Sequence, residues 1–501
     1  KHHDSHIGLA VASSGYKKTL YLSLDGGGDF GDTRNSVFGE FSNFKFRNFG
    51  EDKGLGNICS FHAFITDFLC FGIDNGKVNG LSAYGKVRDE LYNKFNKVVT
   101  INKNGIKFDR KRFKATELDF NKFSFEGYQR YKVLNNQPSK TNIFEICKGY
   151  LLEDVAKTAE QFLRDKVLIF LKSLKKRKSS RNIVFSGGLF LNVALNGFIS
   201  EKKIFENSFF NMAPADNGLS LGAIGFYLLK FKKKNFKLNK YGLTPFLGPS
   251  FSQEEVIKII SKFNLKYEIP RNLHYDIAKN ISKRKIVGVF NGRAEFGQRS
   301  LGNRSILADP RSKASKTRLN LLLKKRDWFM PFAPAVIDKD FKKYFPNQHQ
   351  SYYMQVTNQI KNNKLSKKIP SAVHVDGSCG TQLVEKKINN NFWNIINNFK
   401  KITKLPIVLN TSFNRHGIST ISNPRQAIEH LLEGCIDVLY INGLKIKSKL
   451  GAKKLKEDMN FINTEKNLLK KENLSWYHKN KQYLDKKSIK MFQSFLRKNF
   501  K

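Results

Sequence analysis

The chain has 501 residues, of which 40% are hydrophobic, so its length favours two or three domains and allows a sizeable core. No apolar run approaches the length of a bilayer span, which excludes a transmembrane helix. The formal net charge of +47 indicates either a nucleic-acid or other anionic partner, or a lysine-rich composition spread along the whole chain, and we favour the second interpretation.

The first half of the chain alternates predicted helices with predicted strands. Residues 19–24 (TLYLSL) alternate as a strand does and end at Asp25, which a glycine turn follows. Residues 182–188 (NIVFSGG) predict a buried strand and a tight glycine turn, and residues 213–230 predict a loop that opens a helix just after Asp216. Further expectations are helices over 7–16, 57–72, 150–174 and 189–199, a glycine-punctuated loop over 77–85, and an insertion or small subdomain over 87–145.

The second half begins after a charged stretch of little periodicity, residues 231–246, which predicts a linker between two domains. The sequence FSQEEV then has the form of a helix start, with Ser252 as the capping residue and Glu255 three positions further on. Strands are expected over 285–292 and 404–414, each running into a polar turn. Strands and helices therefore alternate in both halves, which predicts an α/β fold.

The C-terminal tail and the cysteines suggest no catalytic chemistry. Residues 451–501 form the densest basic stretch, and we expect an extension that is a surface helix or a partner-binding arm. The cysteines are scattered and odd in number, which argues against a disulfide framework or a zinc knuckle and favours a reducing, cytoplasmic compartment. They are Cys59, Cys70, Cys147, Cys379 and Cys435. The oligomeric state is left open, with a homodimer as one alternative.

Residues 292–311, GRAEFGQRSLGNRSILADPR, are the most informative segment of the chain, and we call them the arginine segment. Guanidinium groups match phosphate and carboxylate oxygens with paired hydrogen bonds, and glycines let backbone N–H groups approach an anion. Asp309 and Glu295 are expected to hold some of the arginines in place. The arginines are Arg293, Arg299, Arg304 and Arg311, and the apolar residues that anchor the segment are Phe296, Leu301, Ile306 and Leu307.

Two histidines and two aspartates form a candidate metal site. His2 and His6 are four residues apart, which places both imidazoles on one face of a helix. Asp25 ends a predicted strand, and Asp216 precedes a predicted helix. Two imidazole nitrogens with carboxylates suit Fe(II), Mn(II) or Zn(II), although a histidine pair by itself is weak support for a metal. His3 is expected either to join these residues or to be structural.

Four residues of the second half form a candidate phosphate site. Lys324 and Arg326 precede the stiff segment DWFMPFAPAV, and as residues two apart on an extended strand they would share one face. Ser412 and Asn414 follow a predicted strand and offer a hydroxyl and an amide. Together with the arginine segment, these groups could bind a nucleotide and an acyl phosphate. Each motif alone is also explained by surface charge or by an ordinary turn.

With these segments in place, the chain resembles the carbamoyltransferases of the NodU/CmcH type, from Lys1 to about Lys447. The resemblance rests on ten ordered motifs, of which the arginine segment is the most specific. The other nine are HHDSH (2–6), SLDGGG (23–28), KVNGLSAYG (77–85), SGGLFLN (186–192), PADNGLSLGA (214–223), LGPSFS (247–252), KKRDWFMPFAP (324–334), HVDGS (374–378) and NTSFN (410–414).

The resemblance implies two domains and a basic extension. Residues 1–230 are expected to resemble the actin/hexokinase-type (ASKHA-like) ATPase fold, and residues 247–450 a YrdC-like α/β domain. By motif position, the first domain is expected to hold a divalent metal, Fe(II) in preference to Mn or Mg. Its ligands would be His2, His6, Asp25 and Asp216.

The resemblance also implies an activity. Such enzymes take carbamoyl phosphate and ATP, form a carbamoyl-adenylate in the YrdC-like domain, and transfer the carbamoyl group to an acceptor hydroxyl at the metal site, here expected on a sugar-containing metabolite. Clustered cations would offset negative charge as phosphate and pyrophosphate leave, and the metal would polarise an oxygen. Catalytic roles are expected for His2, His6, Lys324 and Arg326. The carbamoyl-phosphate and ATP ligands are expected to be Arg293, Arg299, Arg304, Arg311, Lys324, Arg326, Ser412, Asn414, Gly187 and Gly188.

The chain departs from the family pattern in several places. The family has a strand and a short loop ahead of the HHxxH motif, so we expect the first domain to be incomplete at its N-terminus and the activity of these 501 residues to depend on that segment. Smaller departures are Gln298 in place of proline, Asn79 in place of methionine, and Gly380-Thr381 where an arginine is expected.

Two other functions remain as alternatives. A tRNA-modifying enzyme that makes threonylcarbamoyl-adenosine would share both folds and suit the positive charge, but the order of the domains and the arginine segment argue against it. The other alternative is an inactive nucleotide- or RNA-binding fragment. If the first function is right, Arg304→Ala or Lys324→Ala should abolish adenylate formation with the fold intact, and His6→Ala should block transfer alone.

Overall fold

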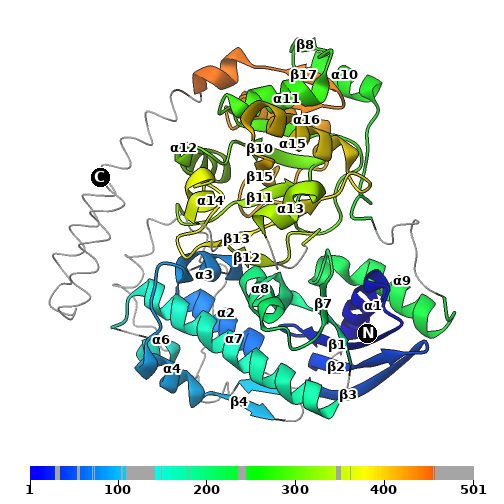
Figure 1. The fold of residues 1–501 in the computed structure, drawn as a ribbon, viewed down its shortest axis with the longest axis vertical. Helices are drawn as coiled ribbons and strands as arrows, with labels where there is room; N and C mark the ends of the chain where they lie inside the picture. The colour runs from blue at the N-terminus through cyan, green and yellow to red at the C-terminus, as the bar shows by residue number, and fades with distance from the viewer. Residues whose placement is uncertain are drawn as a thin grey trace.

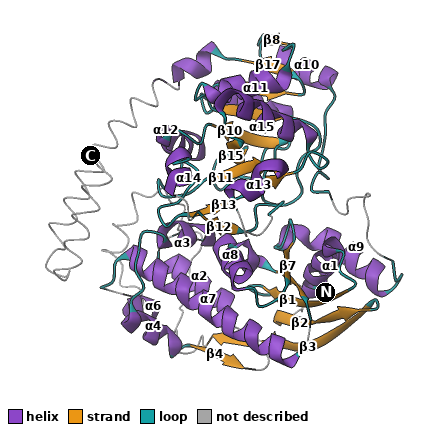
Figure 2. Cartoon of the chain, viewed as in Figure 1, coloured by secondary structure: helices purple, strands orange, loops and turns teal. Residues whose placement is uncertain are grey.

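A computed structural model of the protein describes residues 1–28, 34–53, 57–69, 71–72, 74–102, 105–108, 142–147, 149–178, 180–234, 244–345, 351–360, 363–454 and 456. These residues form two regions, each built on a β-sheet with helices packed against it (Figures 1 and 2). We call residues 1–234 the N-terminal region and residues 244–456 the C-terminal region. The mixed α/β architecture predicted for both halves is confirmed.

The sheet of the N-terminal region has five strands in the order β3-β2-β1-β6-β7. Strand β1 lies in its centre, antiparallel to β2 and parallel to β6. The alternation that predicts this strand is confirmed, because Leu20, Leu22 and Leu24 pack on one face of the sheet and Tyr21 packs on the other. The strands are β1 (Lys18–Leu24), β2 (Arg34–Ser42), β3 (Lys45–Lys53), β6 (Asn182–Ser186) and β7 (Asn207–Phe210).

Helices cover both faces of this sheet and give three layers. Helices α1 and α9 pack together on the face of Tyr21, and α7, the longest helix, lies with α2 on the other face. The helices are α1 (His2–Ser14), α2 (Ile58–Phe68), α3 (Asn75–Ser82), α4 (Asp89–Asn96), α6 (Asn142–Cys147), α7 (Leu152–Arg177), η2 (Gly188–Leu191), α8 (Val193–Lys202), η3 (Asp216–Gly218) and α9 (Leu219–Lys230). The hairpin of β4 (Val99–Asn102) and β5 (Gly105–Phe108) packs into the hydrophobic core that α2 and α7 form with the sheet.

Two expectations for this region need correction. The loop expected over 77–85 is instead mostly helix α3, which Asp74 caps by accepting a hydrogen bond from the N–H of Gly76. Gly80 marks a close contact rather than a turn, since a Cβ there would lie 2.9 Å from the sulfur of Met330. The helix expected over 189–199 is split into η2 and α8, because the Asn192 side chain caps α8. Most of the insertion over 87–145 lies outside the described residues.

The sheet of the C-terminal region has eight strands in the order β14-β11-β15-β10-β9-β16-β17-β8. It is mixed: β9 is parallel to β16 and antiparallel to β10, which pairs with β15. The strands are β8 (Tyr267–Glu268), β9 (Val287–Phe290), β10 (Arg304–Ala308), β11 (Ala333–Ile337), β14 (Gln382–Val384), β15 (Ile407–Ser412), β16 (Val438–Ile441) and β17 (Leu444–Ile446), and a separate pair is β12 (Thr357–Gln359) and β13 (Ser378–Gly380). The strands predicted near 285–292 and 404–414 are thus β9 and β15.

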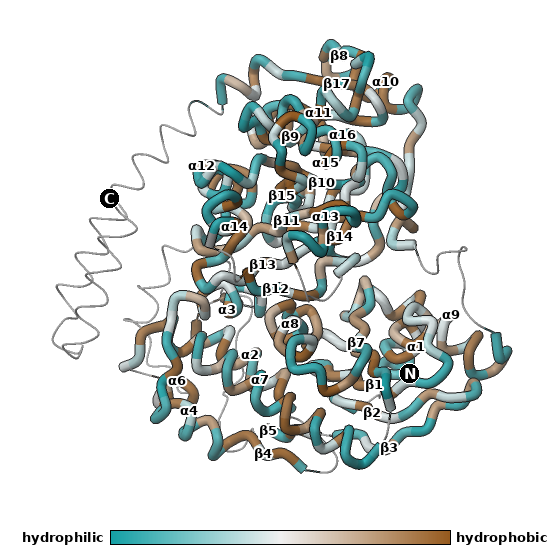
Figure 3. The backbone as a smooth tube through the Cα atoms, in the orientation of Figure 1, coloured by the Kyte–Doolittle hydropathy of each residue, from teal (hydrophilic) through white to brown (hydrophobic). Residues whose placement is uncertain are grey.

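The helices of the C-terminal region share one hydrophobic core with this sheet. The predicted helix start at Ser252 is confirmed as a capping box with Glu255. Among the described residues, no helix is long and apolar enough to cross a membrane, and hydrophobic and hydrophilic positions alternate along the chain (Figure 3). The helices are α10 (Gln253–Ser261), α11 (Leu273–Ser282), α12 (Lys313–Arg318), η4 (Leu319–Lys324), α13 (Asp338–Tyr344), α14 (Asn363–Lys368), α15 (Asn390–Thr403) and α16 (Pro424–Leu432). Residues 235–243 of the linker expected over 231–246, and nearly all of the tail at 451–501, lie outside the described residues.

Candidate functional site

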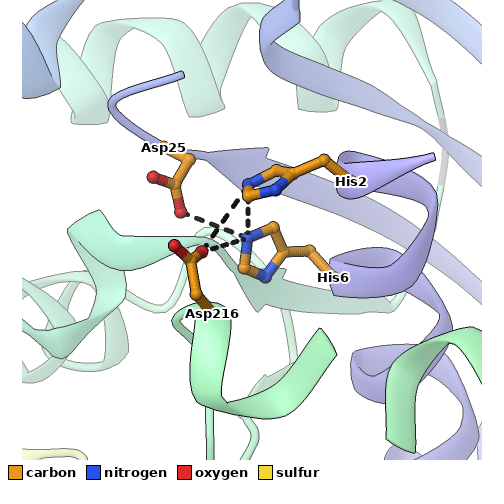
Figure 4. A group of neighbouring side chains, drawn as sticks. All are labelled: His2, His6, Asp25 and Asp216. Atoms are coloured by element: carbon orange, nitrogen blue, oxygen red, sulfur yellow. Dashed lines mark hydrogen bonds and ion pairs between the residues drawn. The ribbon is translucent and has the colours of Figure 1, made fainter. Parts of the chain in front are cut away.

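The two histidines and two aspartates expected to bind a metal come together at one end of the N-terminal sheet (Figure 4). His2 and His6 lie on one face of α1, which begins five residues earlier than expected and ends at Ser14, because Gly15 takes a left-handed conformation. Asp25 follows the last residue of β1, and Asp216 opens η3. We call these four residues the histidine–aspartate cluster: His2, His6, Asp25 and Asp216.

The distances within the histidine–aspartate cluster suit one bound metal ion. The Nε2 atom of His6 lies 3.1 Å from Nε2 of His2, 3.2 Å from Oδ2 of Asp25 and 3.4 Å from Oδ1 of Asp216. Ligand atoms held at about 2.1 Å from one ion, in tetrahedral or octahedral arrangement, lie about 3.0–3.4 Å apart. Two facing imidazole nitrogens also repel each other unless a proton or a cation lies between them. The donor atoms therefore fit a divalent metal.

Backbone contacts hold Asp25 in position. Its carboxylate accepts hydrogen bonds from the N–H groups of Gly26 and Gly188, each at 2.6 Å. Gly187 has φ 94°, and a Cβ there would lie 2.1 Å from the carbonyl oxygen of Leu24, so this turn requires glycine. Gly187 and Gly188, which we expected to bind nucleotide, thus bring the end of β6 against the end of β1. Their nucleotide role stays a prediction.

The charges of the cluster favour cation binding. Burial alone would lower the pKa of His6, but hydrogen bonds with Asp216 and Asp25 outweigh burial and raise this pKa. Burial would raise the pKa of Asp25, but the hydrogen bond with His6 and the N–H groups of Gly188 and Gly26 lower it. Two carboxylates therefore face the imidazoles, and their negative charge favours a bound cation at this place.

His3 is structural rather than a third histidine ligand. Its Nδ1 lies 2.8 Å from Oγ of Ser23, and its Nε2 lies 2.8 Å from the carbonyl oxygen of Arg34. Burial lowers the pKa of His3 to about 4, so it stays neutral at physiological pH. Both ring nitrogens are used to fasten α1 to β1 and β2, which keeps the adjacent His2 in place.

A cavity of about 380 Å³ adjoins the histidine–aspartate cluster. It is lined by residues of the N-terminal region and by Gln298, which belongs to the arginine segment of the C-terminal region. The side chain of Asn217 lies 3.5 Å from that of Gln298. No local sequence pattern indicates that Gln298 reaches this cavity, since Asn217 and Gln298 are far apart along the chain. The lining residues are Asp25, Gly188, Leu191, Ala215, Asp216, Asn217 and Gln298.

Three of the four arginines of the arginine segment bind protein oxygens. The guanidinium of Arg304 is buried, donates to four backbone carbonyls and stacks on Phe290 at 3.6 Å. Arg293 donates to two backbone carbonyls, and Arg311 forms a bidentate pair with Asp309 as expected. Glu295 instead accepts backbone N–H groups of the segment. The ligand roles of Arg293, Arg304 and Arg311 stay predictions.

The apolar anchors of the segment behave mostly as predicted. Leu301, Ile306 and Leu307 are buried, and Phe296 is partly buried against a small cluster that includes Met212. Gly297 has φ 103° and approaches the carbonyl oxygen of Met212 closely, so a side chain there would clash. The arginine segment therefore contacts the N-terminal region around Phe296 and Gly297.

Lys324 and Arg326 do not project from an extended strand, which corrects the expected geometry. Lys324 ends η4, a π-helical turn, and Lys325 has φ 47°. The buried ammonium of Lys324 donates to the backbone and side-chain oxygens of Ser412 and Asn414 at 2.6–3.0 Å. Burial, with Arg326 nearby, holds the pKa of Lys324 well below its usual value.

Arg326 lies near this lysine, and Arg299 lies near Arg326. Burial lowers the pKa of Arg326 to about 10, and the charges of Asp74 and Asp327 oppose the shift whereas Arg299 adds to it. Within the described residues, Nε of Arg299 is buried and has no hydrogen-bond partner. We call Arg299, Lys324, Arg326, Ser412 and Asn414 the cationic cluster. Arg326 donates to the side chain of Asn320 and the carbonyl oxygen of Pro331, so the donor left for an anionic ligand is Nε of Arg299.

Charged residues that the sequence did not single out surround the cationic cluster. Nε2 of His416 lies 2.6 Å from Oδ2 of Asp74, and Nζ of Lys77 lies 3.0 Å from Oδ2 of Asp327. Asp74 and Lys77 belong to the N-terminal region. The motif KVNGLSAYG begins at Lys77, three residues after Asp74, so it was a usable signal for these contacts that we had interpreted as a loop.

Comparisons with known proteins agree with the ten motifs. The Carbamoyltransferase N-terminus family model matches residues 1–225, and the Carbamoyltransferase C-terminus model matches residues 278–448. The chain is 31% identical over 469 residues to uncharacterized protein MJ1058 of Methanocaldococcus jannaschii, covering 90% of this chain and 74% of that protein. It is 28% identical to nodulation protein NolO of Bradyrhizobium diazoefficiens, covering 89% and 79%. It is also 28% identical to nodulation protein NolNO of Sinorhizobium fredii, covering 89% and 63%.

Proposed function

The chain belongs to the carbamoyltransferase family, and from that premise we propose that it is an ATP-dependent O-carbamoyltransferase whose donor is carbamoyl phosphate. One observation carries the proposal. Gln298 lines the cavity of the histidine–aspartate cluster, and the next residue, Arg299, lies among the charges of the cationic cluster. Consecutive residues of one segment thus connect a site suited to activating an anionic donor with a site suited to a metal and an acceptor.

The proposed reaction has two parts. At the cationic cluster, water displaces phosphate from carbamoyl phosphate, and an oxygen of the resulting carbamate bonds to the α-phosphorus of ATP as pyrophosphate leaves. At the cavity, the oxygen of an acceptor hydroxyl bonds to the carbamoyl carbon, the hydroxyl proton is released and AMP leaves. The adenylate would otherwise hydrolyse, so it has to pass between the two sites without meeting bulk water.

The side chains of the cationic cluster suit the first part. Arg299 and Arg326 would offset the negative charge that develops as phosphate and pyrophosphate depart. Lys324, with Ser412 and Asn414 around its ammonium, would present a positioned donor at the same place. In this proposal Arg304 and Arg311 keep their bonds to the protein and support the segment, since both already have protein partners.

The histidine–aspartate cluster suits the second part. His2, His6, Asp25 and Asp216 would hold the metal, with Fe(II) preferred and Mn or Mg as alternatives. When bound, such a metal supplies a Lewis acid that polarises an oxygen. The polar side chains of Asn217 and Gln298 at the cavity favour a hydroxylated acceptor such as a sugar-containing metabolite.

We propose the same division for the domains. Residues 1–230 would form an ASKHA-like transfer domain and residues 247–450 a YrdC-like activating domain, joined by a linker over 231–246 and followed by a basic extension over 451–501. The separate five-stranded and eight-stranded sheets support this division. NolO and NolNO carry names that refer to nodulation, and the biosynthetic, small-molecule role proposed here follows from the carbamoyltransferase family alone.

Pyrophosphate release tests the proposal. The chain is incubated with ATP and either carbamoyl phosphate or threonine plus bicarbonate. Release that depends on carbamoyl phosphate supports the proposal, and release that depends on threonine and bicarbonate supports tRNA modification instead. Salt-sensitive RNA binding without release in either mixture would indicate a non-catalytic role.

A further inference from the structure

Helix α3 of the N-terminal region carries two charged side chains into the C-terminal region. Asp74 caps the helix and pairs with His416 at 2.6 Å, and Lys77, one turn further on, pairs with Asp327 at 3.0 Å. The Lys77–Asp327 pair is nearly buried, with 11% and 7% of the two side chains exposed. Both ion pairs therefore cross between the two regions.

The partners of these pairs are directly attached to the cationic cluster. The backbone N–H of His416 donates to the carbonyl oxygen of Lys324 at 3.1 Å, and His416 is two residues from Asn414. Asp327 is the residue after Arg326. A shift of either ion pair would move the turn that holds Asn414 against Lys324, or the segment that holds Arg326.

Asp74 also supplies a negative charge where the cluster needs one. Burial lowers the pKa of Arg299, and the charge of Asp74 opposes that effect. Burial also lowers the pKa of Arg326, and Asp74 opposes the shift there as well. Several cations held together in a low-dielectric site repel each other, so a nearby carboxylate stabilises the set before an anionic ligand arrives.

Attachment of the two regions does not depend on these charges alone. Gly80 of α3 packs closely against Phe329 and Met330. Elsewhere, Oγ1 of Thr357 donates to the carbonyl oxygen of Val193 at 3.3 Å. Apolar packing and neutral hydrogen bonds thus also hold the regions together, whereas the two ion pairs of Asp74 and Lys77 lie beside the cationic cluster.

We propose that Asp74 and Lys77 of α3 are positioning residues of the donor site, so that the cationic cluster has its active geometry only while the N-terminal region is docked on it. This inference rests on the proposed function. It also provides a reason for the two regions to act together, because donor activation is then confined to the state in which the adenylate can pass directly to the transfer site.

The test uses Asp74→Asn in the full chain. Asparagine can still accept the hydrogen bond from Gly76, so the helix cap is preserved and only the charge is removed. We expect kcat for carbamoyl-phosphate-dependent pyrophosphate release to fall by about tenfold or more, since misplacement of catalytic groups lowers the rate. The KM for carbamoyl phosphate should not rise, because a negative charge next to an anion site has been removed.

Two further variants separate positioning from general stability. The double variant Asp74→His with His416→Asp exchanges the two partners, so that an ion pair can form again with the carboxylate at position 416. It should recover part of the lost kcat. Thr357→Val removes a neutral contact between the regions and should leave kcat and KM unchanged. Equal activity of wild type and Asp74→Asn, or an equal loss in Thr357→Val, would overturn the inference. Absence of carbamoyl-phosphate-dependent release in the wild type would instead overturn the proposed function.

Discussion

Arg304→Ala tests whether the most buried guanidinium of the arginine segment holds the protein together or contacts the donor. Arg304 is fully buried, stacks on Phe290, and donates four hydrogen bonds of 3.0–3.1 Å to backbone carbonyls. Removal of the guanidinium takes one donor from each of these carbonyls, although those of Asn303 and Pro249 still accept from the N–H groups of Asn291 and Ala294. The carbonyls belong to Pro249, Asn291, Gly292 and Asn303. The structure thus replaces our expectation of an intact fold with one of lower stability.

The size of the effect follows from these contacts. A hydrogen bond to a charged group contributes about 1.5–3 kcal/mol, and a buried cation–π contact contributes about 2 kcal/mol. The loss in the free energy of unfolding is smaller than the sum of these contributions, because the variant no longer has to desolvate the charge of Arg304. A buried acceptor left unpaired costs about 1–3 kcal/mol, and with the lost stacking on Phe290 we expect a decrease of about 3–5 kcal/mol in the free energy of unfolding. That is a large share of the free energy of unfolding of a domain, which is roughly 5–15 kcal/mol.

Urea unfolding followed by tryptophan fluorescence measures this change. Trp328 and Trp393 lie in the C-terminal region, and Trp476 lies in the tail, so the signal reports on the half of the chain that carries Arg304. Arg293→Ala is the matched control, because its exposed guanidinium also donates to two carbonyls and its loss should cost no more than about 1 kcal/mol. An unchanged midpoint for Arg304→Ala, together with lost pyrophosphate release, would refute this reasoning.

Three predictions concern the two clusters. His6→Ala should leave pyrophosphate release intact and block carbamoyl transfer, and metal analysis should show loss of the bound ion; unchanged metal content would contradict the assignment. Hydrogen bonds with Asp216 and Asp25 raise the pKa of His6 above its usual 6.5, so protons should compete with the metal and its affinity should fall in a titration as the pH is lowered through that raised pKa. In the metal-free chain the stabilisation from protonated His6 should be complete below about pH 6.5 and disappear as the pH rises through the raised pKa. Lys324→Met should lower pyrophosphate release by about a hundredfold or more without changing the circular dichroism spectrum, and a normal rate would exclude a role for its ammonium.

Features that depend on neighbouring residues could be predicted from the sequence. The spacing of His2 and His6 places both on one helix face, and the alternation before Asp25 predicts the strand that ends there. The capping box of Ser252 and Glu255 involves residues three apart. These predictions succeed because helix and strand periodicity is set by local backbone geometry.

Predictions failed where a distant contact explains the residue. We interpreted Gly80 as part of a loop, but it lies within α3. The lack of a side chain there lets Phe329 and Met330 of the C-terminal region pack against the helix. We placed Lys324 and Arg326 on one strand face, but Lys324 ends a π-helical turn and Lys325 has a positive φ, so the two residues lie near each other without a strand. Neither cause is visible in the local pattern, because both depend on packing against other parts of the chain.

The sequence by itself determined the family and the chemical groups available: the histidine pair, the aspartates, the arginine segment and Lys324 with its neighbours. Tertiary structure alone decided which of those groups face each other. Arg304 became an internal support, Gln298 reached the cavity beside the histidine–aspartate cluster, and Asp74 met His416 more than 300 residues away. Residue types follow from the chain directly, whereas contacts between distant charges depend on how two separately built sheets pack together, and no local periodicity encodes that packing.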